Sequence, residues 1–180
     1  MGLRPACSTR RYDGPANTRQ AHRKMSKAFV RGVPGGKCHT FQTGILKGDY
    51  GLKLTLVATD WMQLRHNQLE SARVTINQYL VKGFGPEGFY MKFYAYPHHI
   101  VRENALATGA GADRFQSGMS KAFGKPAGTA ARVKPGTKLF AAWVPAGNEK
   151  IVKLAFRKAS NKLSTHTKTV VEQLKTATTK

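Results

Sequence analysis

Apolar residues recur at intervals of three and four between Asn67 and Lys82, and they alternate one by one in the segments on either side. The first spacing is that of a helix with one buried face, and the second is that of strands. A chain that holds both periods, separated by short turns, combines helices and strands in one domain. The apolar stripe of the expected helix consists of Leu69, Ala72, Ile76 and Leu80.

The ends of this helix carry recognisable signals. Asn67, followed three residues later by Glu70, has the form of an N-cap with its reciprocal acid. Gly83 and Gly85 supply the stop, because glycine ends helices readily. We therefore expect a helix over residues 67–82.

Several segments have the pattern of strands. Leu52, Leu54 and Leu56 alternate with polar neighbours, and we expect this segment to form a hairpin with residues 37–46 across the turn KGDYG. Residues 89–95 alternate between two rather apolar faces, which is typical of a central strand. The other expected strands are 62–65, 128–133 and 138–144, the last two joined by a turn at 134–136.

A second helix is expected after Asn148, a possible cap, and its outward side is rich in Lys and Arg. Its apolar stripe consists of Ile151, Val152, Ala155, Phe156 and Ala159, with Leu163 near the end. The order of elements predicts a mostly antiparallel sheet packed by two helices on one side, a sandwich of the α+β class.

Composition divides the chain into three parts. Residues 1–37 hold nine basic residues against one acid, with prolines between them, and we expect an extended basic arm. Residues 38–163 form the α+β domain. Residues 164–180 are rich in Lys and Thr, and this basic tail is either a short amphipathic helix or frayed.

The charge points to a polyanionic partner. The sequence has 30 Lys and Arg against 9 Asp and Glu, a formal charge of +21, while 41% hydrophobic residues suffice for a core. No apolar run approaches the length that spans a bilayer, and the first residues lack the apolar centre of a signal peptide. We therefore expect a nucleic-acid partner, a cytoplasmic location and no membrane association.

The sequence gives little support for a metal site, a disulfide bond or a cofactor. Cys7 and Cys38 form no C-x-x-C pair, and with His22 and His39 they match none of the usual zinc spacings. We expect reduced thiols, no metal and no cofactor.

The stretch RENALATGAGADRFQSGM, residues 102–119, is the longest segment without core-forming bulk. It matches no dinucleotide-binding G-x-G-x-x-G pattern. Flexible backbone with embedded Arg102 and Arg114 can instead fit against a phosphate or nucleotide that comes and goes. We expect a flexible loop over residues 104–118.

Two further patterns leave alternatives open. Tyr90, Tyr94 and Tyr96 beside Lys92 form a base-stacking platform or, more commonly for such aromatic residues, close a core. Catalysis has weak support, since adjacent histidines on an extended segment point to opposite faces and no catalytic triad or phosphate-binding motif is present.

Four blocks of sequence resemble a known family. They are LRPACSTRRYDGPANTR at 3–19, RHNQLESARVTINQYL at 65–80, YPHHIVREN at 96–104 and ATGAGADRFQSGMSKAFGKPAGTAARV at 107–133. The chain resembles the universal large-subunit ribosomal protein family called L-sixteen in bacteria, in its archaeal and eukaryotic branch (L-ten-e, or QM protein). Residues around 38–61 and after 163 match only loosely.

The resemblance implies a hammerhead-like α+β fold and a structural role in the large ribosomal subunit, beside the peptidyl-transferase centre and the aminoacyl-tRNA site. The implied partners are large-subunit rRNA, tRNA in the aminoacyl and peptidyl sites, and neighbouring ribosomal proteins. The implied rRNA-binding residues are Arg4, Arg10, Arg11, Arg65, His66, Arg73, His98, His99, Lys121, Lys125 and Arg132. The implied tRNA-facing loop residues are Arg102, Asn104, Thr108, Gly109, Gly111, Asp113 and Arg114.

Two competing hypotheses belong to other classes. A free RNA-binding module or RNA chaperone would leave ribosomes at moderate salt. A small metal-dependent nuclease would use His98, His99 and Glu103, and its RNA cleavage would stop on chelation.

Overall fold

The computed structural model describes residues 4–5, 12, 14–18, 30, 32–46, 48, 50–107, 109–114, 116, 118–120 and 122–174. The strands are β1 (Gln42–Gly44), β2 (Leu52–Ala58), β3 (Met62–Arg65), β4 (Tyr90–Phe93), β5 (His99–Glu103), β6 (Lys125–Val133), β7 (Lys138–Val144) and β8 (Thr167–Gln173). The helices are α1 (His66–Phe84) and α2 (Glu149–Ser160), with a 3-10 turn, η2, at Ala112–Arg114. Within the described residues, no helix is long and apolar enough to cross a membrane.

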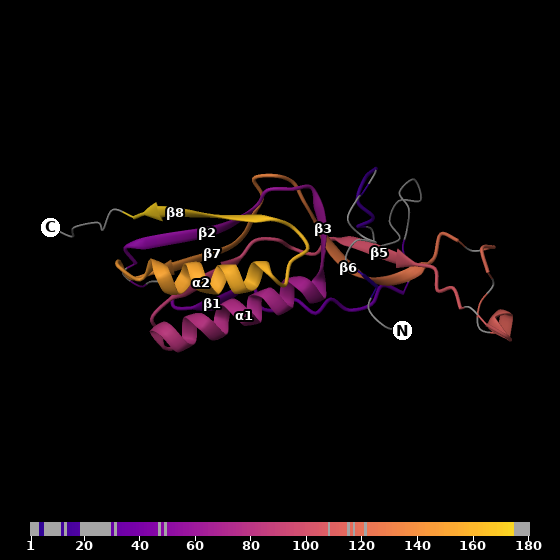
Figure 1. Ribbon diagram of the computed structural model, residues 1–180, viewed down its shortest axis with the longest axis horizontal. Helices are drawn as coiled ribbons and strands as arrows, with labels where there is room; N and C mark the ends of the chain where they lie inside the picture. Colours follow the sequence, from indigo (N-terminus) through magenta and orange to yellow (C-terminus); the bar gives the residue numbers. More distant parts are fainter. Residues whose placement is uncertain are drawn as a thin grey trace.

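The strands form two antiparallel sheets. The larger has the order β1-β4-β7-β2-β8, and the smaller has the order β3-β6-β5. The two lie end to end along the long axis of the molecule, and the smaller sheet continues into the long connection between β5 and β6 (Figure 1). The second sheet was not part of the expected sandwich.

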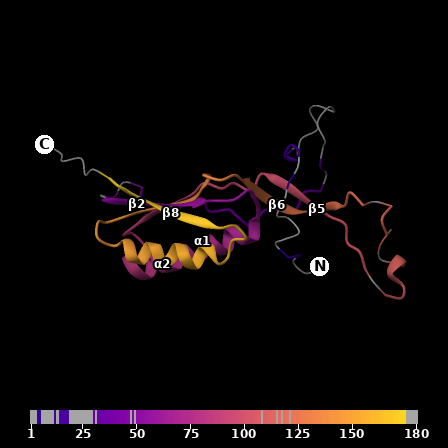
Figure 2. The same cartoon turned by 45° about the horizontal axis from the view of Figure 1, so that its top comes forward.

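Both helices cover one face of the five-stranded sheet, as Figure 2 shows. Leu52, Leu54 and Leu56 of β2 are buried on that face, which confirms the alternation expected there. Leu69, Ala72, Ile76 and Leu80 of α1 are fully buried, as are Val152, Ala155, Phe156 and Ala159 of α2. The structure confirms the α+β class and the two helices on one side.

The first helix begins at a different cap from the one expected. Arg65 is the N-cap, and its backbone N–H donates to Oε1 of Gln68 at 3.1 Å. Glu70 is instead held by Arg73, so it is not available to a cap at Asn67. At the other end Gly85 has a φ of +74°, and its N–H donates to the Val81 carbonyl at 2.9 Å. The glycine stop is therefore confirmed, two residues beyond the predicted end.

The expected hairpin between β1 and β2 is wrong. β1 pairs with β4, and both edges of β2 are occupied by β7 and β8. Gly44 explains the pairing of β1, because a Cβ there would lie 1.9 Å from the carbonyl oxygen of Phe89 and the φ is +91°. The glycine allows the backbones of β1 and β4 to come close, and Ile45 continues the ladder by donating to Phe89 O.

The tail was also predicted incorrectly. Residues 167–173 form neither a helix nor a frayed end but β8, which pairs with β2 at seven positions from Leu52↔Gln173 to Ala58↔Thr167. Its Thr and Val residues favour a strand because β-branched side chains fit a pleated surface. Residues 175–180 lie outside the described residues. The boundaries at residues 37 and 163 stay predictions.

Strands β3, β6 and β7 agree with expectation, whereas β5 was not predicted as a strand. β3 and β7 have the expected bounds, and β6 begins three residues earlier, at Lys125. The turn between β6 and β7 is closed by Thr137 N–H donating to Lys134 O at 3.0 Å, with Gly136 at a φ of +84°.

The aromatic strand is β4, which pairs on both edges as a central strand should. Tyr90 is buried, and its ring lies 5.0 Å from that of Trp143, so it closes the core. Tyr94 and Tyr96 remain exposed, and Tyr96 packs against Phe41 at 5.5 Å. A platform of all three tyrosines is therefore excluded.

Candidate nucleic-acid interface

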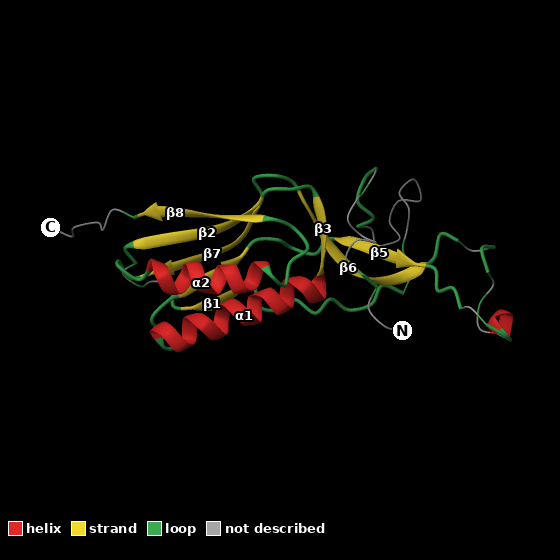
Figure 3. Cartoon of the chain, viewed as in Figure 1, coloured by secondary structure: helices red, strands yellow, loops and turns green. Residues whose placement is uncertain are grey.

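The β5–β6 hairpin and its connection, residues 104–124, project from the helix-covered body. Figure 3 shows this end of the molecule without a covering helix. Within the hairpin, register places Glu103 opposite Lys125 and His99 opposite Ala130. The candidate residues Arg102, Lys125, His99 and Arg132 are thus brought onto one small sheet.

Arg102 is fixed at the base of the long connection. Its Nη1 donates to the Gly124 carbonyl at 2.9 Å, and its guanidinium carbon lies 4.3 Å from the Phe123 ring centroid. Gly124 has a φ of +78°, and a Cβ there would lie 2.6 Å from the Glu103 carbonyl carbon. The glycine lets the two ends of the loop meet, and Arg102 ties them together. Phe123 itself is 73% exposed.

Beyond this base, the loop is held by its own polar contacts. Asn104 Nδ2 donates to the Gly118 carbonyl at 3.3 Å. Gln116 accepts from Ala107 N–H at 2.6 Å and donates back to Ala107 O at 2.8 Å. The η2 turn then presents the exposed Arg114 at the end of the molecule. Exposed apolar side chains here are Leu106, Met119 and Phe123.

Two glycines near η2 adopt backbone conformations that L side chains rarely adopt. Gly109 has a φ of +126° and Gly111 a φ of +75°, and a Cβ at either would meet nothing within 4 Å. The positive φ, and not a lack of room for a side chain, therefore favours glycine at both positions. Of the expected loop residues, Thr108 lies outside the described residues, and for Asp113 the structure describes only the backbone.

His99 and Arg132 hold part of the N-terminal arm. Asn17 N–H donates to His99 Nδ1 at 3.0 Å, and Ile100 N–H donates to Asn17 O at 2.9 Å. Arg132 Nη1 donates to Gly14 O at 2.8 Å, and its guanidinium lies 4.7 Å from the Tyr12 ring centroid. These two candidate RNA-binding side chains are therefore engaged within the protein.

The surroundings of His99 keep it neutral. Burial, followed by the nearby charges of Arg132 and His98, lowers the pKa of His99 to about 4. Since Nδ1 accepts the Asn17 N–H, this nitrogen carries no proton. A second proton would break that contact and place a charge 3.4 Å from an Arg132 nitrogen.

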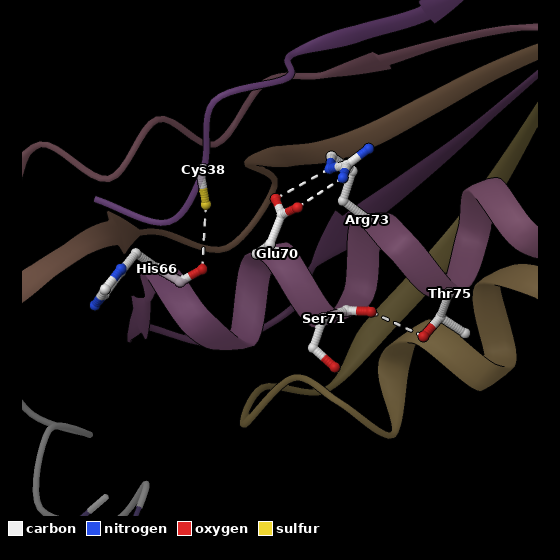
Figure 4. Close-up of polar contacts among 6 residues, drawn as sticks. All are labelled: Cys38, His66, Glu70, Ser71, Arg73 and Thr75. Carbon is white, nitrogen blue, oxygen red and sulfur yellow. Dashed lines mark hydrogen bonds and ion pairs between the residues drawn. The ribbon is translucent and has the colours of Figure 1, made fainter. Parts of the chain in front are cut away.

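A second set of contacts attaches residues 37–38 to the start of α1, and Figure 4 shows the one between Cys38 and His66. Cys38 Sγ donates to the His66 carbonyl at 3.1 Å, and Lys37 N–H donates to His66 Nδ1 at 2.9 Å. Burial and the charges of Lys37 and Arg65 lower the pKa of His66. Burial is also the main reason that the pKa of Cys38 rises to about 11, so its thiol is protonated at neutral pH.

The Glu70 carboxylate holds Arg73 through two bonds, from Nη2 at 2.6 Å and from Nε at 3.0 Å (Figure 4). This hydrogen bonding raises the pKa of Arg73. Arg73 is therefore an internal partner of Glu70 on α1.

The remaining candidates are more open. Arg4 forms an ion pair with Glu103 at the base of the loop. His98 is partly exposed, with Nδ1 3.0 Å from Tyr96 O, and Lys125 is exposed. Arg10, Arg11 and Lys121 lie outside the described residues. Among those described, no three His, Cys, Asp or Glu side chains gather as metal ligands would, which leaves the nuclease hypothesis without a metal site.

One basic surface was not among the candidate sites predicted from the sequence. The outward side of α2 and the residues after it expose five cations, defined here as the α2 cationic face: Lys150, Lys153, Arg157, Lys158 and Lys162. The helical spacing that identified the buried stripe also places these residues outside, so the signal was present in the sequence.

Comparisons with known proteins agree on one family. The family described as "Ribosomal protein L16p/L10e" matches residues 17–170. The "Large ribosomal subunit protein uL16" of Archaeoglobus fulgidus is 42% identical over 173 residues, covering 96% of this chain and 95% of that protein. The protein of the same name from Picrophilus torridus is 44% identical over 171 residues, covering 95% and 93%. That from Halobacterium salinarum is 42% identical over 176 residues, covering 96% of each.

These matches extend across both sheets, both helices and the β5–β6 connection. The resemblance inferred from the four sequence blocks is confirmed by the independent match of the family as a whole. The chain therefore belongs to the ribosomal protein L16p/L10e family.

Proposed function

We propose that this protein is a structural constituent of the large ribosomal subunit, in the cytoplasm, where it binds large-subunit rRNA near the peptidyl-transferase centre and the aminoacyl-tRNA site. Family membership supports the first part, since the relatives are named large-subunit proteins. Its role is binding and not catalysis, because the family is one of ribosomal structural proteins. Its other partners are tRNA and neighbouring ribosomal proteins.

One observation supports the rRNA contact most directly. The β5–β6 hairpin extends beyond the helix-covered core and carries the exposed Lys125 close to the loop. Cations on a projecting hairpin can neutralise phosphates without unfolding the body that holds them. Release of counterions from the RNA then favours binding and makes affinity fall with salt.

We propose that the loop contacts tRNA. Arg114 on the η2 turn is exposed, and Gly109 and Gly111 have positive φ in open surroundings. Backbone without side chains can approach a nucleotide closely, and an adjacent guanidinium can pair with its phosphate. The proposed contact residues are those implied by the resemblance, from Arg102 to Arg114.

The test replaces one exposed cation of the loop and leaves its base intact. Arg114→Ala should weaken binding of tRNA to the aminoacyl site of purified ribosomes by about fivefold, which corresponds to about 1 kcal/mol for one exposed charged contact. Incorporation into the large subunit should be unchanged. Lys138→Ala, which removes an exposed cation from β7, is the matched control and should alter neither quantity.

Arg102→Ala gives a second and distinguishable result. It should weaken tRNA binding more than Arg114→Ala does, because it removes the contact to Gly124 O and the packing on Phe123 that hold the base of the loop. Loss of incorporation in either variant, or unchanged tRNA binding in both, would contradict the loop assignment.

The free RNA-binding module remains the second candidate, because +21 charges alone would let the chain bind RNA non-specifically. It predicts release from ribosomes at moderate salt. Sedimentation in high salt separates the two.

A further inference from the structure

The α2 cationic face is the strongest surface feature that the proposed function leaves unused. Its cations line the outward half of the helix, opposite the buried Val152, Phe156 and Ala159. Lys150, Lys153 and Arg157 follow one another at intervals of three and four, so they form a row along the helix. Leu154, 46% exposed, lies among them.

These cations have few acidic partners. Among the described residues, the ion pairs with a side chain of this face are limited to Lys153 with Glu149, at 2.6 Å. Lys150, Arg157, Lys158 and Lys162 are exposed and have no acid within ion-pair distance in the part of the chain that is described. The face therefore carries a net positive charge that the described residues do not neutralise.

The arrangement is not one that helix stability requires. Lys150 beside Lys153, and Lys153 beside Arg157, are like-charge neighbours, which mildly destabilise a helix. Lys150 also lies in the first turn, where the helix dipole disfavours a cation, although Arg157 and Lys158 in the last turn are favoured. A bound polyanion would convert this repulsion into attraction.

The neighbouring helix shows that solubility does not require such a face. α1 lies beside α2 on the same side of the sheet, and its exposed residues Ser71, Val74, Gln78 and Val81 are uncharged, with a single exposed cation, Lys82, in the last turn. Two adjacent helices of one layer therefore differ in what they present to their surroundings. Only the α2 face has the charge and the row-like spacing that suit a nucleic-acid backbone.

We propose that the α2 cationic face is a second RNA-binding surface, which contacts the sugar-phosphate backbone of large-subunit rRNA independently of the β5–β6 loop. This inference rests on the proposed function for its partner. α2 lies on the helix-covered body, at the opposite end of the long axis from the η2 turn (Figure 1). The RNA held by α2 is accordingly a different segment from the one near the tRNA, and the two surfaces together hold the protein at both ends.

The test compares two variants that each lose three lysines. The first is Lys150→Gln, Lys158→Gln and Lys162→Gln on the α2 cationic face. The matched control is Lys92→Gln, Lys138→Gln and Lys168→Gln, which removes the same charge from strands of the five-stranded sheet. The probe is deproteinised large-subunit rRNA, and its affinity for the full-length chain is measured by filter binding from low to high salt.

We expect the α2 variant to lower the slope of log affinity against log salt by about 2 to 3, since each lost phosphate contact removes about 0.7 to 0.9. The control should change the slope by less than about 1. The thermal unfolding midpoint of the α2 variant should shift by less than about 2 °C, because relieved repulsion offsets the lost dipole interaction. Weaker binding from an equally stable protein excludes a merely structural role.

Other outcomes show whether the inference or the proposed function is wrong. If the α2 variant and the control lower the slope equally, the inference is wrong and the proposed function stands. If the unaltered chain shows no preference for this rRNA over a random RNA of equal length, the proposed function fails as well. If rRNA binding is unchanged but the α2 variant no longer enters subunits, the face binds a neighbouring acidic protein, and the RNA assignment is overturned.

Discussion

The five-stranded sheet and the three-stranded sheet share one apolar core, to which the smaller sheet adds Met62, Leu64 and Val133, but they differ in their further contacts. Leu54, Phe140 and Met91 of the larger sheet are buried beneath two helices, so apolar burial dominates there. The smaller sheet instead receives the arm through Asn17, Gly14 and Tyr12, which bind polar side chains. Apolar packing fixes the body, and polar contacts fix the segments nearest the candidate interface.

The core of the larger sheet should respond most strongly to truncation. Phe140 on β7 is fully buried, and its ring stacks on that of Phe93 at a centroid distance of 4.7 Å. Phe140→Ala should lower the free energy of unfolding by about 3–5 kcal/mol, through lost burial and the cavity left behind. Urea denaturation followed by circular dichroism measures this. A loss below about 1 kcal/mol would mean that the sheet is not the stabilising body.

Gly44 in the five-stranded sheet and Gly111 in the β5–β6 loop allow a matched comparison of the two regions. Gly44→Ala in β1 should cost about 2–3 kcal/mol, because both the positive φ and the Phe89 carbonyl at 1.9 Å oppose a methyl group. Gly111→Ala in the loop shares the positive φ but meets nothing within 4 Å, and it should change global stability by less than about 0.5 kcal/mol. Equal losses in the two variants would contradict the division.

The arm contact should depend on pH. His99 has a pKa of about 4 in the folded protein and about 6.5 when unfolded, so the unfolded chain takes up a proton first as pH falls. Stability from His99 is therefore complete above about pH 6.5 and decreases toward pH 4, by about 2 kcal/mol between pH 7 and pH 5. Denaturation of the unaltered chain and of His99→Asn, at both pH values, isolates this contribution. An identical pH dependence in both proteins would refute it.

The sequence predicted the parts of the fold that depend on local periodicity. β3 and β7 have the bounds expected from alternation, and the buried stripe of α1 is the one read from spacing. The partner of β1 could not be read in this way, because strand pairing depends on distant backbone and on Gly44 meeting Phe89. β8 was missed because Thr and Val among charged residues give no clear period.

The candidate site was predictable to a smaller extent. Blocks of sequence placed Arg102 and Lys125 near the loop, where the structure has them. The contacts of His99 and Arg132 with the N-terminal arm could not be predicted from a pattern in the sequence. Their partners are backbone groups of Asn17 and Gly14, which lie 82 and 118 residues away. Whether these side chains also touch RNA stays a prediction.

Sedimentation of cell lysate through a sucrose gradient in high salt, with immunodetection of the protein, tests the central claim most directly. A structural constituent held by many charged contacts should migrate with the large subunit and with whole ribosomes, at about one copy in each. If the protein remains at the top of the gradient, the claim that it is a structural constituent of the large subunit is contradicted, and a free RNA-binding module takes its place.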